Sequence, residues 1–141
     1  MDIRQITPHF FAAPQISPED IPDIAAAGIT RIICNRPDVE IPPSHYADVL
    51  ANAAKAANIE FFVRPLTHQT MTPDVIEENW RMIDEADGPV LSYCASGTRS
   101  TIAWALGAAR NMPADEIIAA AASGGYDLAG FRPVLEATYQ P

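Results

Sequence analysis

The sequence predicts a three-layer α/β/α fold, in which helices cover both faces of a mainly parallel central sheet of four to five strands. Short β-prone apolar runs alternate with helical patterns from end to end, and the crossovers are long enough to hold a helix between parallel strands. A length of 141 residues, 48% of them apolar, suits one domain with a complete core. We therefore expect a single domain over residues 1–141.

The first helix is marked at both ends by its sequence. Ser17 is placed to cap it, Pro18 occupies the first helical position and Gly28 ends it. Ile21 and Ile24 have the spacing of one helical face. The other elements follow in alternation. Strands are expected at 10–13, 30–35, 59–66 and 89–94. Helices are expected after a Ser44 cap, from Thr72-Pro73 to Gly88, from near Arg99 to just before Met112-Pro113, and on either side of Gly124-Gly125.

Charge and composition disfavour several classes of partner. The net charge is −9 and Lys55 is the only lysine, which argues against binding to nucleic acid or to anionic membranes. No apolar run approaches the roughly 18 residues of a membrane span, and the first residues lack a signal-peptide pattern. We therefore expect a cytoplasmic protein with reduced cysteines. An anion site in so acidic a chain has to be local, built from main-chain N–H groups and arginines.

The stretch CASGTRS, residues 94–100, joins an apolar strand to a helix. Ligands of parallel sheets bind beyond the carboxyl ends of the strands, where both Cys94 and the Asn35-Arg36 pair are expected to lie. Gly97 supplies the conformational freedom that a tight turn needs. The N–H groups after the cysteine are expected to form an anion nest at the helix N-terminus: these are the N–H groups of Ala95, Ser96, Gly97 and Thr98.

Three side chains of this loop carry the candidate chemistry. Cys94 is the candidate nucleophile, because a positive environment favours its thiolate. Arg99 is a candidate bidentate clamp for an oxyanion, and Ser100 is placed to donate its hydroxyl to the thiolate or to a leaving sulfur. The structural alternative is a buried core cysteine with Ser100 as a helix cap. Cysteine, glycine, arginine and serine together at one strand-to-helix junction favour the reactive interpretation.

The same residues carry a resemblance to a known family. CASGTRS, the segment QISPEDIPDIAAAGITRIICNRPDVE and the terminal GYDLAGFRP together resemble the bacterial beta-lactamase-hydrolase-like, phosphatase-like domain family. The resemblance covers nearly the whole chain. It implies the fold of dual-specificity tyrosine phosphatases, with Cys94 as nucleophile and Arg99 as anion clamp. Members of that family are also found joined to sulfide-oxidising and persulfide-handling enzymes, and some are described as sulfur transferases.

Individual positions agree with the family pattern or depart from it. Gly97 and Ser100 match the corresponding positions of the family loop. Ala95 departs, because many members have an arginine there, so this loop has one cation fewer. Arg36 lies in the second motif, NRPDVE, and is a candidate residue of the pocket. The alternative for Arg36 is a surface side chain packed by Pro37.

Two features bear on whether the loop handles phosphate or sulfur. Tyrosine phosphatases place five residues between cysteine and arginine, whereas this chain has the four of rhodaneses, residues 95–98. Phosphatases also use an aspartic acid to protonate the leaving alkoxide. Here the expected position holds Thr67 or His68, and the next carboxylate is Asp74. His68 fits a surface loop and Asp74 fits the first turn of a helix, unless one of them replaces the missing acid.

Sulfane-sulfur transfer through a Cys94 persulfide is therefore the function that the sequence predicts, because it needs no such acid when sulfite or a stabilised thiolate leaves. Phosphomonoester hydrolysis through a cysteinyl-phosphate is the alternative, and a non-catalytic anion-binding or partner-binding module is the third possibility. The expected partners are a small anionic or persulfide substrate and a sulfur-relay protein.

Neither a cofactor nor a metal is expected, since His9, His45 and His68 show no ligand spacing. Cys34 is expected to pack in the core. The alternative for Cys34 is that it resolves an oxidised Cys94, which requires disulfide geometry.

Overall fold

The computed structural model describes residues 2–141 and confirms the predicted architecture. Five strands form one sheet in the order β1-β2-β5-β3-β4, and every neighbouring pair is parallel except β1 and β2. The sequence does not predict β1, because a strand of two residues leaves no alternation to detect. The strands are β1 (Arg4–Gln5), β2 (Phe10–Ala13), β3 (Arg31–Cys34), β4 (Glu60–Val63) and β5 (Val90–Tyr93).

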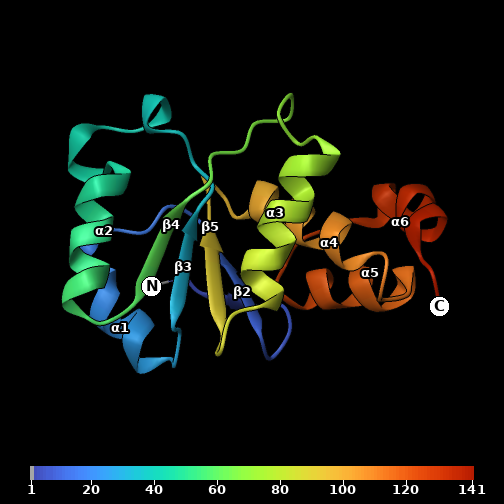
Figure 1. Ribbon diagram of the computed structural model, residues 1–141, viewed down its shortest axis with the longest axis horizontal. Coiled ribbons are helices and arrows are strands. Elements are labelled where there is room, and N and C mark those ends of the chain that lie inside the picture. Colours follow the sequence, from blue (N-terminus) through green and yellow to red (C-terminus); the bar gives the residue numbers. More distant parts are fainter. Residues whose placement is uncertain (1) are drawn as a thin grey trace.

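The helices form a layer on each side of the sheet (Figure 1). The helices α1 (Ile21–Ala26) and α2 (Ala47–Ala56) pack on one face, and α3 (Pro73–Asp84) and α4 (Thr98–Ala108) pack on the other. Beyond α4 lie α5 (Ala114–Ser123) and α6 (Arg132–Thr138). None of the helices within residues 2–141 is both long and apolar enough to cross a bilayer.

The boundaries of the helices show which local signals decide them. Ser17 donates its N–H to the carboxylate of Asp20 at 2.9 Å, as expected for the start of the first helical segment. The prediction that Ser44 caps α2 is wrong, because residues 43–45 form a separate 3₁₀ turn ahead of the helix. The first N–H of α2, that of Ala47, is instead accepted by Asp38 Oδ1 at 2.9 Å. A loop residue nine positions away thus replaces the local cap.

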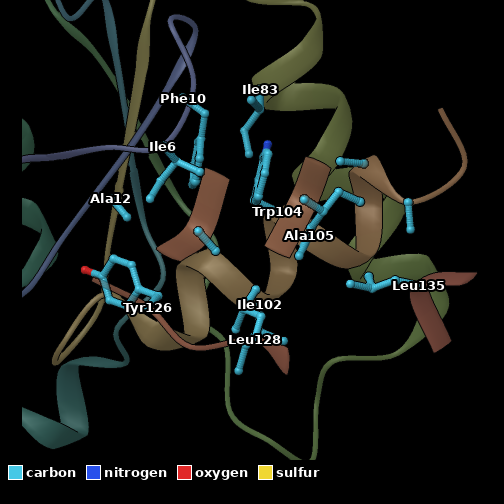
Figure 2. Close-up of a cluster of buried hydrophobic side chains, with 14 of the residues drawn as sticks. Ile6, Phe10, Ala12, Ile83, Ile102, Trp104, Ala105, Tyr126, Leu128 and Leu135 are labelled. Carbon is cyan, nitrogen blue, oxygen red and sulfur yellow. The ribbon is translucent and has the colours of Figure 1, made fainter. Parts of the chain in front are cut away.

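Each face of the sheet has its own apolar core. On the α1–α2 face, Ile32 and Leu91 of the sheet pack with Leu50 of α2. On the other face, the rings of Phe10 and Trp104 lie against one another (Figure 2). They are stacked, with a centroid separation of 5.4 Å. The stack joins β2 to α4, the helix that follows the candidate loop. The core therefore fixes where α4 begins relative to the ends of the strands.

Trp104→Ala should lower the free energy of unfolding by about 3–5 kcal/mol, because it removes a large buried ring and leaves a cavity. Urea unfolding measures the loss. Val39→Ala is the control, since the Val39 side chain is 95% exposed and its truncation should change stability by less than about 0.5 kcal/mol. A similar small change for Trp104→Ala would contradict the role of the stack.

Candidate active site

The carboxyl ends of β3 and β5 bring Asn35 and Cys94 to the same edge of the sheet. The ladder pairs Cys34 with Tyr93, and one residue further on the Asn35 N–H still donates to the Tyr93 carbonyl at 2.9 Å. The segments that leave this edge, residues 35–46 and 64–72, rise on either side of it at the top of Figure 1. The sequence motifs CASGTRS and NRPDVE therefore meet here.

Cys94 has no solvent-exposed surface, and its Sγ accepts the Gly97 N–H at 3.2 Å. Burial alone fits a core cysteine equally well, whereas a main-chain N–H directed at the sulfur is the arrangement that stabilises a thiolate. Gly97 has a φ of 94°, in the left-handed region that favours glycine. The N–H groups of Ala95 and Ser96 have no acceptor within residues 2–141, so they are available to an anion.

The rest of the loop is tied to its surroundings through short polar contacts. The Ala95 carbonyl accepts the Gln15 N–H at 3.3 Å, which links the loop to the segment after β2. The exposed Ser96 hydroxyl donates to Thr98 Oγ1 at 2.9 Å and accepts the Thr98 N–H at 3.3 Å. These contacts close the turn into α4, which begins at Thr98, one residue before the predicted start.

Arg99 uses one edge of its guanidinium to bind Glu40. Its Nη1 donates to Glu40 Oε2 at 2.9 Å and to the Leu66 carbonyl at 2.8 Å, and its Nη2 donates to Glu40 Oε1 at 2.7 Å. A guanidinium has five N–H groups, and no oxygen within residues 2–141 accepts from the Nε–H or the second Nη2–H. The pKa of Arg99 is raised, first by the hydrogen bond with Glu40 and also by the neighbouring Cys94.

Glu40 is a site residue that the sequence did not predict. Its Oε1 also accepts from Arg36 Nε at 3.2 Å, so one carboxylate holds both arginines. Arg36 Nη1 in turn donates to Gln15 Oε1 at 3.3 Å. The pKa of the Glu40 carboxyl is lowered, chiefly by the hydrogen bond from Arg99. Arg36 is thus connected to Arg99 of the loop through the Glu40 carboxylate. The position of Glu40 at the end of NRPDVE was the available signal, but its pairing across 59 positions with Arg99 has no local signature.

The expectation that Ser100 donates to the Cys94 thiolate needs correction. Ser100 is fully buried and its hydroxyl donates to Asn35 Oδ1 at 2.8 Å. The Asn35 amide then donates to the Arg64 carbonyl at 2.8 Å and to Asn79 Oδ1 at 3.2 Å. A hydroxyl has a single proton to donate, so Ser100 ties the first turn of α4 to the end of β3.

The two candidate general acids, His68 and Asp74, make no hydrogen bond to the loop within residues 2–141. Both residues are exposed. Asp74 occupies the first turn of α3, where a carboxylate favours the helix dipole. No group of three or more His, Cys, Asp or Glu side chains among the described residues is arranged to hold a metal ion.

Cys34 lies on the other face of the sheet. It is in register with Tyr93 and packs in the α1–α2 core, whereas Asn35 and Cys94, one residue later, face α3 and α4 by the alternation of side chains. The Cys34 Sγ–H contacts the Arg36 carbonyl at 3.4 Å, and burial raises the pKa of its thiol. These contacts favour core packing over resolution of Cys94.

Comparison with known proteins shows to which family the chain belongs. Residues 2–111 match the family model described as beta-lactamase hydrolase-like protein, phosphatase-like domain. The chain belongs to this phosphatase-like domain family. It is accordingly a phosphatase-like domain, in which Cys94 directly follows β5.

The curated relatives of this phosphatase-like domain are longer proteins. The beta-lactamase hydrolase-like protein of Agrobacterium fabrum is 34% identical over 90 residues, which cover 64% of this chain and 21% of that protein. The protein of the same description from Xylella fastidiosa Temecula1 is 30% identical over 130 residues, which cover 91% of this chain and 30% of that protein. The chain thus spans less than a third of the curated relatives that it matches.

Solved structures share the whole fold. A candidate phosphatase from Neisseria meningitidis Z2491 has a TM-score of 0.84 and 34% identity, and the match covers 98% of this chain and 99% of that one. A candidate phosphatase from Shewanella putrefaciens has a TM-score of 0.71 at 14% identity, over 97% of this chain and 90% of that one. PTPMT1 has a TM-score of 0.73 at 15% identity, over 96% and 92%. The last two establish the fold alone, which is tyrosine-phosphatase-like.

Glu40→Gln should lower the melting temperature at neutral pH, because the ionised carboxylate holds two arginines. The folded-state pKa of Glu40 lies below its ordinary value of 4.5, so its stabilisation is present above that pH and is lost as the pH falls through the folded-state pKa. The gap between wild type and Glu40→Gln should therefore shrink below pH 4.5, and added salt should narrow it too.

Calorimetry over this pH range measures the gap. Glu19→Gln is the matched control, because Glu19 is exposed and makes no ion pair in the part of the chain described. A gap for Glu40→Gln that grows on acidification would contradict the assigned ion pairs.

Proposed function

We propose that this domain hydrolyses phosphomonoesters through a cysteinyl-phosphate on Cys94. The observation that carries the proposal is the set of unused donors around the loop: the Ala95 and Ser96 N–H groups and the free edge of Arg99. Donors of this kind suit a transferring phosphoryl group, which spreads charge over three equatorial oxygens. A persulfide donor offers them no oxygen, whereas thiosulfate offers the oxygens of its sulfite group. The family match and the 34% identical candidate phosphatase support the same choice.

The proposed reaction has two steps, each a displacement at phosphorus. The Cys94 thiolate attacks phosphorus, the S–P bond forms and the bond to the leaving oxygen breaks. Water then attacks the cysteinyl-phosphate, the S–P bond breaks, and phosphate and the thiolate are released. The developing charge on the oxygens is stabilised by the Arg99 edge and the main-chain N–H groups. The carboxyl group that the loop contacts, Glu40, is paired with Arg99 and has a lowered pKa, so it is a poor proton donor. The preferred substrates are therefore aryl phosphates, whose leaving oxyanions need little protonation.

Sulfane-sulfur transfer is the second candidate, and it is favoured by the four residues between Cys94 and Arg99 and by the exposed positions of His68 and Asp74. In this reaction the thiolate attacks the outer sulfur of thiosulfate, the S–S bond breaks and sulfite leaves with the electron pair. Mass spectrometry after thiosulfate treatment should then show one added sulfur atom on Cys94, and cyanide should release it as thiocyanate. A protein inactive in this assay and on aryl phosphates would be a non-catalytic anion-binding module.

Cys94→Ser should reduce hydrolysis of an aryl phosphate by at least about a thousandfold, because serine lacks the nucleophilic thiolate. Release of the phenol measures the rate. Cys34→Ala is the matched control, since it removes the other thiol from the opposite face of the sheet and should keep wild-type activity. Equal activity of Cys94→Ser and wild type would eliminate both covalent mechanisms.

A further inference from the structure

Tyr126 connects the C-terminal part of the chain to the candidate loop. It follows the Gly124-Gly125 turn after α5 and is only 5% exposed. The ring lies at the margin of the apolar cluster, and its hydroxyl points away from the other labelled side chains (Figure 2). The hydroxyl donates to the Ser96 carbonyl at 3.0 Å. A residue 30 positions after Ser96 therefore holds the main chain of the loop directly.

The carbonyl that Tyr126 binds shares a peptide unit with the N–H that binds Cys94. The peptide between Ser96 and Gly97 is planar and trans, so its C=O and N–H point in opposite directions. Tyr126 holds the oxygen at 3.0 Å on one side, and on the other side the Gly97 N–H reaches Cys94 Sγ at 3.2 Å. The orientation of the carbonyl therefore sets the direction in which the N–H points.

Close packing holds this peptide against the tyrosine. A Cβ on Gly97 would lie 2.0 Å from the Tyr126 hydroxyl oxygen, so only glycine allows the approach. The Arg4 guanidinium lies over the Tyr126 ring, 5.1 Å from its centroid, and Arg4 Nη1 donates to the Gly124 carbonyl at 3.3 Å. Burial raises the pKa of the Tyr126 phenol, so its hydroxyl keeps the proton that it donates at neutral pH.

We propose that Tyr126 is a positioning residue for the nucleophile: by fixing the Ser96–Gly97 peptide, it keeps the Gly97 N–H directed at the Cys94 sulfur and so stabilises the thiolate. The proposal rests on the proposed function only in taking Cys94 as the nucleophile. The core also contains the ring of Tyr126, but apolar packing requires no hydroxyl. Removal of the hydroxyl alone therefore separates positioning from packing.

Tyr126→Phe should move the ionisation midpoint of Cys94 to higher pH by roughly half a unit to one unit, because the loosened peptide donates less well to the thiolate. The ultraviolet absorbance of the thiolate measures the midpoint. Each titration is taken as the difference between a protein and its Cys94→Ser counterpart, which cancels Cys34 and the tyrosines. This readout needs neither turnover nor access of a reagent to the buried sulfur.

Tyr139→Phe is the matched control, because no hydrogen bond of the Tyr139 hydroxyl is found within residues 2–141; its midpoint should equal that of wild type. If Tyr126→Phe does not fold, Arg4→Met, which removes the cation over the ring, should give a smaller shift in the same direction. An unchanged Cys94 midpoint in a folded Tyr126→Phe would overturn the proposal. If Arg4→Met has to replace that variant, an unchanged midpoint in Arg4→Met would overturn it in the same way. A shifted midpoint in a protein that hydrolyses no aryl phosphate would support Tyr126 while refuting the proposed reaction.

Discussion

The carboxylate of Glu40 holds two arginines at the edge of the sheet where β3 and β5 end. It binds both terminal nitrogens of Arg99 and the Nε of Arg36, and its segment also provides Asp38, the cap of α2. One acidic side chain thereby joins the loop after β3 to the first turn of α4. The three charges sum to a single positive charge, in a chain whose net charge is −9. Anion binding here depends on the direction of a few donors rather than on a general attraction.

The loop around Cys94 is consistent with that requirement. It is held from outside at three points: Gln15 binds the Ala95 carbonyl, Tyr126 binds the Ser96 carbonyl, and the Leu66 carbonyl accepts from Arg99. Within residues 2–141, the N–H groups of Ala95 and Ser96 have no acceptor. Pre-oriented donors of this kind need no reorganisation as charge develops in a transition state. Cys94 has no exposed surface, so its sulfur is shielded from solvent. The packing around the loop thus both orients the main-chain donors and shields the nucleophile.

The local parts of this site follow from the sequence, and the distant ones do not. A strand that ends at Cys94, a glycine and an arginine before a helix are neighbours in the chain, so their pattern indicates the loop. Glu40 and Tyr126 reach that loop across 59 and 30 positions, and nothing in the spacing of single residues encodes such pairings. The prediction that Ser44 caps α2 was wrong for the same reason, because the N–H of Ala47 is bound by Asp38, a residue nine positions earlier in the chain. The fold could be predicted because alternation and helix termini are local signals; the partners of polar groups depend on tertiary packing.

The proposed hydrolysis requires Cys94 to carry a phosphoryl group during turnover. Rapid acid quenching after mixing with an aryl phosphate, followed by mass spectrometry of the peptide that contains Cys94, detects this intermediate. A phosphoryl adduct on the Cys94 sulfur should form before steady state and should be absent from Cys94→Ser. Release of the phenol without any adduct on Cys94, or a sulfur adduct from thiosulfate in a protein that forms no phosphoryl adduct, would contradict it.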